Sequence, residues 1–330
     1  MMTRTVRPLV SLLVPLALAL SGCGEEGAGP DAPEAEESED VQPAEVEVGE
    51  FVDGAQPGDV VEVEDGITVR VPEPGNLVAV EVMYEDGNTA VATLVNDTDR
   101  GVFLLHPDEH LLGPPEGTAA ACATKCDDTS YSHVFANQGV RAKWKSRLEW
   151  SYRHTNSPIG KSNAIDAFKH AAVAIPKQRN SCSMSDESSA TQRYLGETSR
   201  KPNITKSGSQ INCEAPDGHN VIGWGAIAGG TLAVTCTYAS SDGTNTYRIV
   251  EADQRYDTSN QNWYAGNAVP NNCNNRYSLR GVATHEFGHA YGLGHTPAQC
   301  NQVMAPSTSD CTSRNRKLGR GDVRGVRNLY

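Results

Sequence analysis

The stretch "HEFGHAYGLGH", from His285 to His295, concentrates three of the chain's nine histidines in eleven residues. The preceding "YSLRGVAT" (277–284) places apolar side chains at helical spacing after Ser278, a residue type that commonly caps helices. On a helix His285 and His289 are one turn apart, so their imidazoles project from one face. This arrangement allows two nitrogens to bind the same zinc ion.

The other residues of the stretch complete a catalytic rather than a structural site. Glu286 points about 100° around the helix from His285, so we expect it to stay off the metal and to reach a water beside it. Gly292 predicts the helix end, because glycine adopts a positive φ at little cost. The turn that follows brings back His295 as a third ligand. Three protein ligands leave the fourth position of a zinc ion open, as catalysis requires.

The spacing His-Glu-x-x-His-x-x-Gly-x-x-His resembles the signature of the metzincin zinc peptidases at every fixed position. "NQVMAPS" (301–307) places Met304 where that family has a methionine turn, and it looks like the turn of the matrixin subfamily. "DVRGVRNLY" (322–330) resembles the closing helix of matrixin catalytic domains. The resemblance covers residues 141–330 and is most specific over 285–306.

The resemblance implies an α/β (α+β) fold with a twisted mixed sheet, an active-site helix and a C-terminal helix, in a metallopeptidase domain of residues 120–330. It implies one catalytic Zn²⁺ on His285, His289 and His295. Glu286 would be the general base of a metalloendopeptidase that hydrolyses peptide bonds of extracellular or envelope proteins, with protein or peptide substrates.

The sequence also departs from the matrixin pattern. Matrixins hold a second, structural zinc and calcium ions in a loop rich in His and Asp, whereas "APDGHNVIGWGAIAGG" (215–230) offers only Asp217 and His219. We therefore expect a single zinc, and Ca²⁺ is left open as a further ion. The cysteine-containing propeptide motif that blocks matrixin zinc is absent, and no tyrosine directly follows Met304 to serve as a ligand.

"GTLAVTCTY" (230–238) is expected to be an edge strand that pairs with an extended peptide substrate. Two other functions remain open at this point. One is a catalytically silent zinc-binding surface or adhesion protein, although retention of Glu286 argues against it. The other is a non-proteolytic zinc hydrolase that acts on a small amide. Nucleic acid is not expected as a partner, because no Gly-rich phosphate loop and no basic-aromatic patch is visible.

The first residues are typical of an export signal. Arg4 and Arg7 precede an apolar run over 9–20, which is short for a membrane span but suits a signal-peptide core. The ending "LSGC" resembles the lipobox of bacterial lipoproteins, which implies a signal peptide of residues 1–22 and a lipidated Cys23. The protein is then an exported cell-envelope lipoprotein, anchored to the membrane and facing outside the cytoplasm. The alternative is a simple secretory signal with an incidental cysteine.

Charge and composition divide the rest of the chain. Glu25 to Asp65 holds sixteen acidic residues and no Lys or Arg, while residues 120–330 carry 24 basic against 16 acidic residues. Residues 23–45, rich in Pro, Ala and acid, are predicted to be a disordered tether. Residues 46–113 show alternating runs around Asp-Gly turns, which predict a small all-β domain. Its role is open between a pro-region, a substrate-binding module and a spacer.

Cysteine usage agrees with export. Apart from Cys23, all eight cysteines follow residue 120, and an even count suggests four disulfides formed in an oxidising compartment. Sequence cannot choose the connectivity. We predict one pair, Cys300 with Cys311, because they bracket a short loop.

Overall fold

The computed structural model describes residues 49–85, 89–106, 124–135, 141–227, 229–242, 246–259, 262–296, 301–306 and 308–330. The first part of the chain forms strands β1 (Glu50–Phe51), β2 (Val60–Glu64), β3 (Ile67–Arg70), β4 (Asn76–Tyr84), β5 (Thr89–Asp97) and β6 (Gly101–Leu105). The middle part forms β7 (Ser132–His133), β8 (Arg141–Lys143), β9 (Leu148–Arg153), helix α1 (Lys161–Ala174), β10 (Gln192–Glu197), β11 (Ile204–Ser207), β12 (Gln210–Cys213) and β13 (Asn220–Gly225). The last part forms β14 (Thr231–Ser241), β15 (Thr246–Asp257), β16 (Trp263–Tyr264), β17 (Tyr277–Ser278), α2 (Leu279–Ala290), β18 (Leu293–Gly294), the 3-10 helix η4 (Arg314–Arg316) and α3 (Arg320–Leu329).

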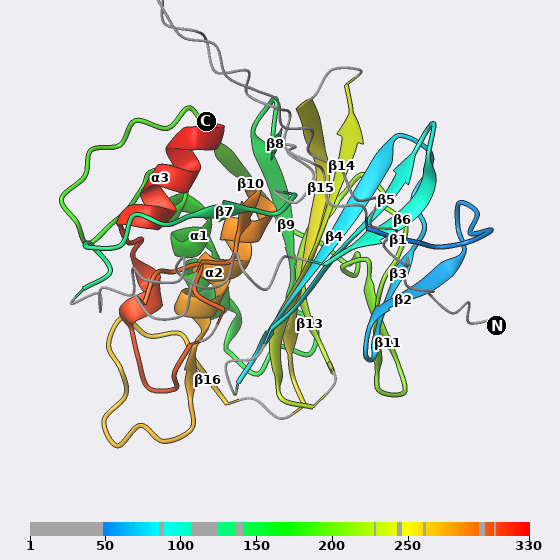
Figure 1. Cartoon of the computed structure of the whole chain (residues 1–330). Helices are drawn as coiled ribbons and strands as arrows, with labels where there is room; N and C mark the ends of the chain where they lie inside the picture. The colour runs from blue at the N-terminus through cyan, green and yellow to red at the C-terminus, as the bar shows by residue number, and fades with distance from the viewer. Residues whose placement is uncertain are drawn as a thin grey trace, which may run out of the picture.

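A ten-stranded mixed sheet runs through the molecule in the order β1-β6-β5-β4-β14-β15-β13-β9-β10, with β8 paired to β15. The three α-helices lie on one side of this sheet (Figure 1). Helices α1 and α2 contact each other and contribute to one apolar core with Trp150, Phe168, Tyr256 and Phe287. A mixed sheet with an active-site helix and a C-terminal helix is the fold class that the sequence predicts, and this prediction is confirmed.

The N-terminal strands β1, β4, β5 and β6 continue the large sheet instead of forming a sheet of their own. Strand β4 pairs antiparallel with β14, with partners from Thr231↔Tyr84 to Ser240↔Asn76. The sheet therefore runs across the division between residues 46–113 and 120–330 that composition suggests. The physical reason is burial, because β14 is buried at nine consecutive positions and β4 at seven. The backbone N–H and C=O groups along their edges are therefore shielded from water and need hydrogen-bond partners on a neighbouring strand.

The pairing of β4 with β14 also overturns the edge-strand prediction. Strand β14 lies between β4 and β15 in the sheet, so "GTLAVTCTY" is a central strand in this structure. Alternation and composition cannot distinguish an edge strand from a central one when its partner lies about 150 residues away in the sequence.

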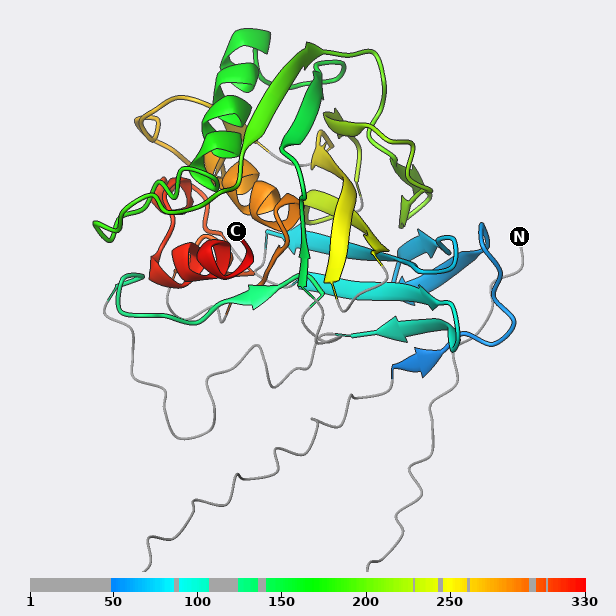
Figure 2. The same ribbon diagram turned by 90° about the horizontal axis from the view of Figure 1, so that it is seen from above.

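A second sheet, in the order β11-β12-β3-β2, covers the face of the large sheet away from the helices. Figure 2 shows the N-terminal strands (blue and cyan) extending from the yellow strands, on the side away from α1. Strand β3 pairs parallel with β12, so the N-terminal part contacts the rest through two separate ladders. The core between the sheets contains Val69, Val80 and Leu94 from the N-terminal part, with Ile211 and Val234 from the remainder.

Three disulfides join described residues: Cys126–Cys182, Cys213–Cys236 and Cys273–Cys311. The predicted pair Cys300–Cys311 is wrong, because Cys311 is bonded to Cys273. Its backbone N–H donates to Arg276 O at 2.8 Å, so the loop before α2 lies beside it, although it is distant in sequence. Cys23, Cys122 and Cys300 lie outside the described residues.

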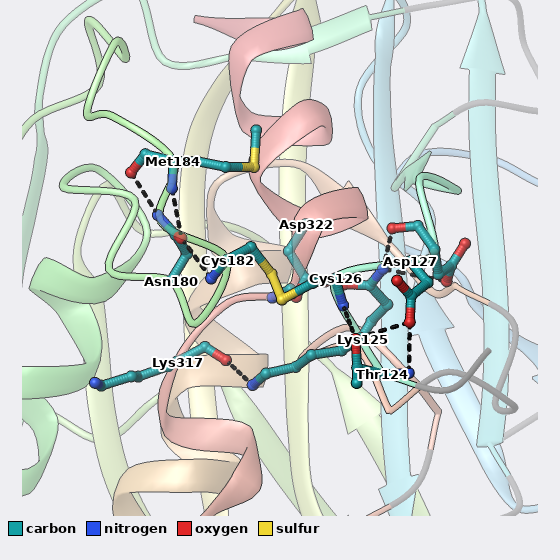
Figure 3. Close-up of a disulfide and its surroundings, with 12 residues drawn as sticks. Thr124, Lys125, Cys126, Asp127, Asn180, Cys182, Met184, Lys317 and Asp322 are labelled. Carbon is teal, nitrogen blue, oxygen red and sulfur yellow. Dashed lines mark hydrogen bonds between the residues drawn. A yellow bond between two sulfur atoms is a disulfide. The ribbon is translucent and has the colours of Figure 1, made fainter.

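The Cys126–Cys182 bond joins the segment 124–127 to the loop after α1 (Figure 3). Asn180 Oδ1 holds this loop by accepting from the backbone N–H groups of Cys182 and Met184, at 2.8 and 3.0 Å. On the other side Lys125 Nζ donates to the carbonyls of Arg314 and Lys317, just before α3. The disulfide therefore stabilises the region where α3 begins. Cystines of this kind are typical of proteins that mature in an oxidising compartment.

Two acidic side chains of β15, Glu251 and Asp253, are buried on the face of the sheet away from the helices. Asp253 Oδ1 accepts from Val221 N at 3.0 Å and Glu251 Oε2 accepts from Gly218 N, and the two carboxyl groups interact with each other. Burial raises the pKa of both carboxyls, and the charge of Glu251 raises that of Asp253 further. The pair therefore retains a proton above the usual carboxyl range.

Replacing Asp253 by asparagine is expected to raise the free energy of unfolding at pH 8 and to change it less at pH 4, because burial and the charge of Glu251 raise the pKa of Asp253 in the folded chain. With the folded pKa above the unfolded one, the carboxyl contributes stability that is complete below the unfolded pKa and lost as pH rises through the folded pKa. An amide still accepts from Val221 N and has no proton to lose. Urea unfolding at pH 4 and pH 8 measures the effect, with exposed Asp166→Asn as control. An equal gain at both pH values would contradict it.

Within the described residues no helix has the length and apolar character needed to cross a lipid bilayer.

Candidate metal centre

Helix α2 positions the first two histidines as the sequence predicts. Ser278 caps it, its Oγ accepting from Gly281 N at 3.2 Å. Gly292 follows the helix with φ +91°, and a Cβ at this position would lie 2.6 Å from Ala142 O, so glycine is required for both conformation and space. The turn leads into β18, after which His295 returns toward the helix.

The three imidazoles converge on one point. His285 Nε2 lies 2.8 Å from His289 Nε2 and 3.2 Å from His295 Nε2. The three ligand atoms all lie within 4.8 Å of one another, and no other such group of His, Cys, Asp or Glu occurs among the described residues. This spacing suits a single ion with nitrogen bonds of about 2.0–2.1 Å, the value for zinc.

The hydrogen bonds made by the Nδ1 atoms show that the Nε2 atoms face the metal position. His285 Nδ1 lies 2.8 Å from Val303 O, and His289 Nδ1 lies 2.8 Å from Leu293 O. A carbonyl only accepts, so both Nδ1 atoms carry the proton and both Nε2 atoms keep a free lone pair. Burial lowers the pKa of all three histidines, to about 4 for His285. The cage is therefore neutral at pH 7 and ready to bind a cation.

Glu286 lies beside the cage with both oxygens buried. Thr235 Oγ1, from β14, donates to Oε2, while Oε1 has no hydrogen-bond partner. Burial raises the pKa of Glu286 to about 8, an effect that the Thr235 hydroxyl partly offsets. A buried carboxylate with one fixed and one unpaired oxygen can act as a base toward a water or substrate beside the metal.

Met304 is buried and packs directly against α2. A Cβ on Gly288 would lie 2.1 Å from Met304 Sδ, so the methionine side chain occupies the space that a larger residue at position 288 would need. Asp322, in the first turn of α3, fixes this turn. Its carboxylate accepts from Val303 N at 2.8 Å, Met304 N at 3.1 Å and Gly319 N at 2.7 Å.

Replacing Asp322 by alanine is expected to destabilise the chain by about 4 kcal/mol, because three buried N–H groups lose their acceptor at about 1–3 kcal/mol each, less what relaxation recovers. Zinc affinity should fall with it, since Val303 supplies the carbonyl that orients His285. Urea unfolding and zinc titration measure both effects. Asp186→Ala, on the surface beside Lys177, is the control. A variant as stable as wild type would show that Asp322 does not hold the turn.

The structure brings together the sequence-predicted residues His285, His289, His295 and Glu286, and packs Met304 against Gly288 of the same helix. It does not add Asp217 and His219, which belong to a surface turn where Asp217 Oδ1 accepts from His219 N. Nothing in the described residues adds support for calcium.

Sequence reasoning missed two residues beside the cage, Thr235 and Glu81. The carboxylate of Glu81, from β4, lies 3.4 Å from His295 Nδ1 and 3.9 Å from His289 Nδ1, and only 1% of its surface is exposed. One signal could have found it: Glu81 is the only charged residue in the otherwise apolar "NLVAVEVMY".

Comparison with known proteins agrees with this geometry. The family model described as Matrixin matches residues 226–330, which include β14, α2, all three histidines and α3. The chain is 41% identical to matrilysin of Homo sapiens and 45% identical to matrilysin of Felis catus, each over 49 residues. Each alignment covers 15% of this chain and only 18% of matrilysin. At the level of family, the match and the histidine cage support a zinc metallopeptidase.

Proposed function

We propose that the chain is a zinc-dependent endopeptidase that hydrolyses peptide bonds of extracellular or envelope proteins. The observation that carries the proposal is the buried cage of three neutral imidazoles whose Nε2 atoms converge beside a carboxylate with one unpaired oxygen. A structural zinc site has no need of such a base.

His285, His289 and His295 would hold the metal. Zinc bound there would supply a Lewis acid that acidifies water and polarises a carbonyl. Glu286 Oε1 is the base that takes a proton from the attacking water, and the same carboxyl then returns it to the departing amine. Thr235 keeps Oε2 fixed, so the free oxygen retains its direction during both transfers.

A second candidate, a catalytically silent zinc-binding surface protein, is favoured by one specific observation. All three imidazoles and Glu286 are buried, and β14 is paired on both sides. A site that stays closed in this way would bind metal without meeting a peptide. The two candidates differ in whether any form of the chain turns over substrate.

The proposal includes location. The export signal and a lipid anchor on Cys23 would place the enzyme on the outer side of a membrane, beyond the acidic tether of residues 23–45. Disulfide bonds support an oxidising compartment. Mass spectrometry of the mature N-terminus tests the anchor: an unmodified Cys23 in the mature protein would contradict it.

Zinc content and cleavage of an unfolded protein such as casein test the activity together. The assay uses the intact chain and a chain cut at a site-specific protease sequence inserted after Gly113. We expect one zinc per chain and cleavage in at least one form, lost on chelation and restored by zinc. If both forms bind zinc and neither cleaves any of a broad set of unfolded proteins, the silent binding protein becomes the better description.

A further inference from the structure

The position of β4 raises the question of what it does at the metal site. Thr235 and Thr237 of β14 face α2, since they hydrogen-bond to Glu286 and to the carbonyl of His289. Their cross-strand partners in β4 are Glu81 and Ala79. Side chains opposite each other on paired strands project from the same face of the sheet. Strand β4 therefore presents Glu81 directly to the cage.

Glu81 supplies what the third histidine otherwise lacks. Carbonyl oxygens accept from Nδ1 of His285 and of His289, but His295 Nδ1 has no hydrogen-bond partner. Glu81 Oε2 also has none, and the two atoms are 3.4 Å apart in a buried setting. When His295 binds metal through Nε2, its proton must sit on Nδ1, and the Glu81 carboxylate is the acceptor within reach.

Charge favours the same arrangement. Two carboxyls, Glu81 and Glu286, are buried at the cage, where an unpaired negative charge is costly. Neither forms an ion pair with Lys or Arg among the described residues. A divalent cation held by three neutral imidazoles would compensate both negative charges.

Strand β4 also occupies the edge that a substrate would use. It runs antiparallel along β14 over most of that strand, and it uses the backbone groups that an added peptide strand would need. His295, the most exposed of the three ligands, is only 6% accessible.

We propose that the N-terminal sheet is a built-in inhibitor of the metal site: β4 takes the place of an extended peptide beside β14, and Glu81 positions His295. This inference rests on the proposed function and adds its regulation. The intact chain holds zinc firmly and excludes substrate. Activity requires that β4 leave β14, and departure of Glu81 then loosens the metal. This form of inhibition differs from that by a cysteine bound to zinc, because Glu81 contacts Nδ1 of His295, the ring nitrogen that faces away from the metal.

The role of Glu81 is tested by zinc affinity and stability together. Glu81→Leu removes both charge and acceptor, and we expect zinc affinity in the intact chain to fall by about 10–100-fold. Glu81→Gln keeps an acceptor oxygen and should lose less. The metal-free variants should unfold at the same temperature as wild type or higher, because a costly buried carboxyl is gone. Exposed Glu73→Gln, just before β4, is the control.

A merely structural role predicts a different result for these variants, since lost packing would lower the unfolding temperature of the metal-free chain as well. Unchanged zinc affinity in both Glu81 variants would overturn the positioning role.

Closure is tested on the chain cut after Gly113. Dilution makes rebinding of the N-terminal fragment bimolecular, and size-exclusion chromatography verifies its release. We expect slow zinc loss to a chelator and at most a tenth of the cleavage rate in the intact chain, with both rates rising on release. Equal zinc loss and equal cleavage before and after release would overturn closure. If zinc loss accelerates but no cleavage appears, closure stands and the proposed peptidase activity fails. Cleavage of casein by the cut chain while size-exclusion chromatography shows that the fragment is still bound would also overturn closure.

Discussion

Glutamine at position 286 is expected to lower peptide cleavage by roughly 10²–10⁴-fold, the usual contribution of a general base, while zinc stays bound. The amide fills the same volume and still accepts from Thr235, so the cage keeps its packing. It cannot take a proton from water or return one to an amine. Zinc content by atomic absorption and cleavage of casein measure the two quantities, in whichever form of the chain is active.

Two comparisons make the Glu286→Gln result specific. Glu187→Gln changes an exposed carboxylate and should leave cleavage and zinc unchanged. The pH profile gives a second readout, because a base with a raised pKa loses activity toward acid and the glutamine variant should lose that limb. If the variant cleaves at a rate similar to wild type with zinc bound, Glu286 is not the base, and the mechanism fails although the metal site remains.

The metal cage was predictable because its chemistry is local. Two ligands and the base lie on one helix, and a single turn at Gly292 determines where His295 returns. Helical periodicity and the conformational preference of glycine therefore sufficed to bring these residues together. Met304 is nine residues beyond His295, and its place depended on the family resemblance, because no periodicity predicts a turn beneath a helix.

The failures all concern contacts between distant parts of the chain. Whether β14 is an edge strand depends on its pairing with β4, and no local sequence pattern predicts that pairing. The same is true of Cys311, which bonds to Cys273 because two loops meet in space. Proximity in sequence suggested Cys300 instead.

Glu81 stands out in the local sequence as a charge in an apolar strand, but the local sequence does not show which residues it contacts. A charge within an apolar strand indicates either a solvent-facing position or a buried partner, and only the fold shows that the partners are His289 and His295. The acidity of residues 25–65 does not predict this contact. The contact with the metal site is instead made by one buried carboxylate, that of Glu81 on β4, a strand hydrogen-bonded to β14.

Replacing His289 by alanine is expected to remove zinc binding and cleavage together, the largest loss of any single change. His289 contributes one of only three ligands, and its Nε2 lies 2.8 Å from that of His285. Loss of a direct ligand should weaken affinity well beyond the ~100-fold that an outer hydrogen-bond partner contributes. In wild type, zinc at ~1,000 times its dissociation constant should stabilise the fold by about 4 kcal/mol, and in the variant by almost nothing.

Differential scanning calorimetry with and without zinc measures this shift. His219→Ala, on a surface turn, is the matched control and should keep the full zinc-dependent gain. The metal-free His289 variant should unfold below the metal-free wild type, because the substitution leaves a cavity and Leu293 O loses its donor, so the zinc-dependent gain is compared within each protein. A variant that still gains stability from zinc and still cleaves would mean that the metal binds elsewhere, and the assignment of the cage would have to be abandoned.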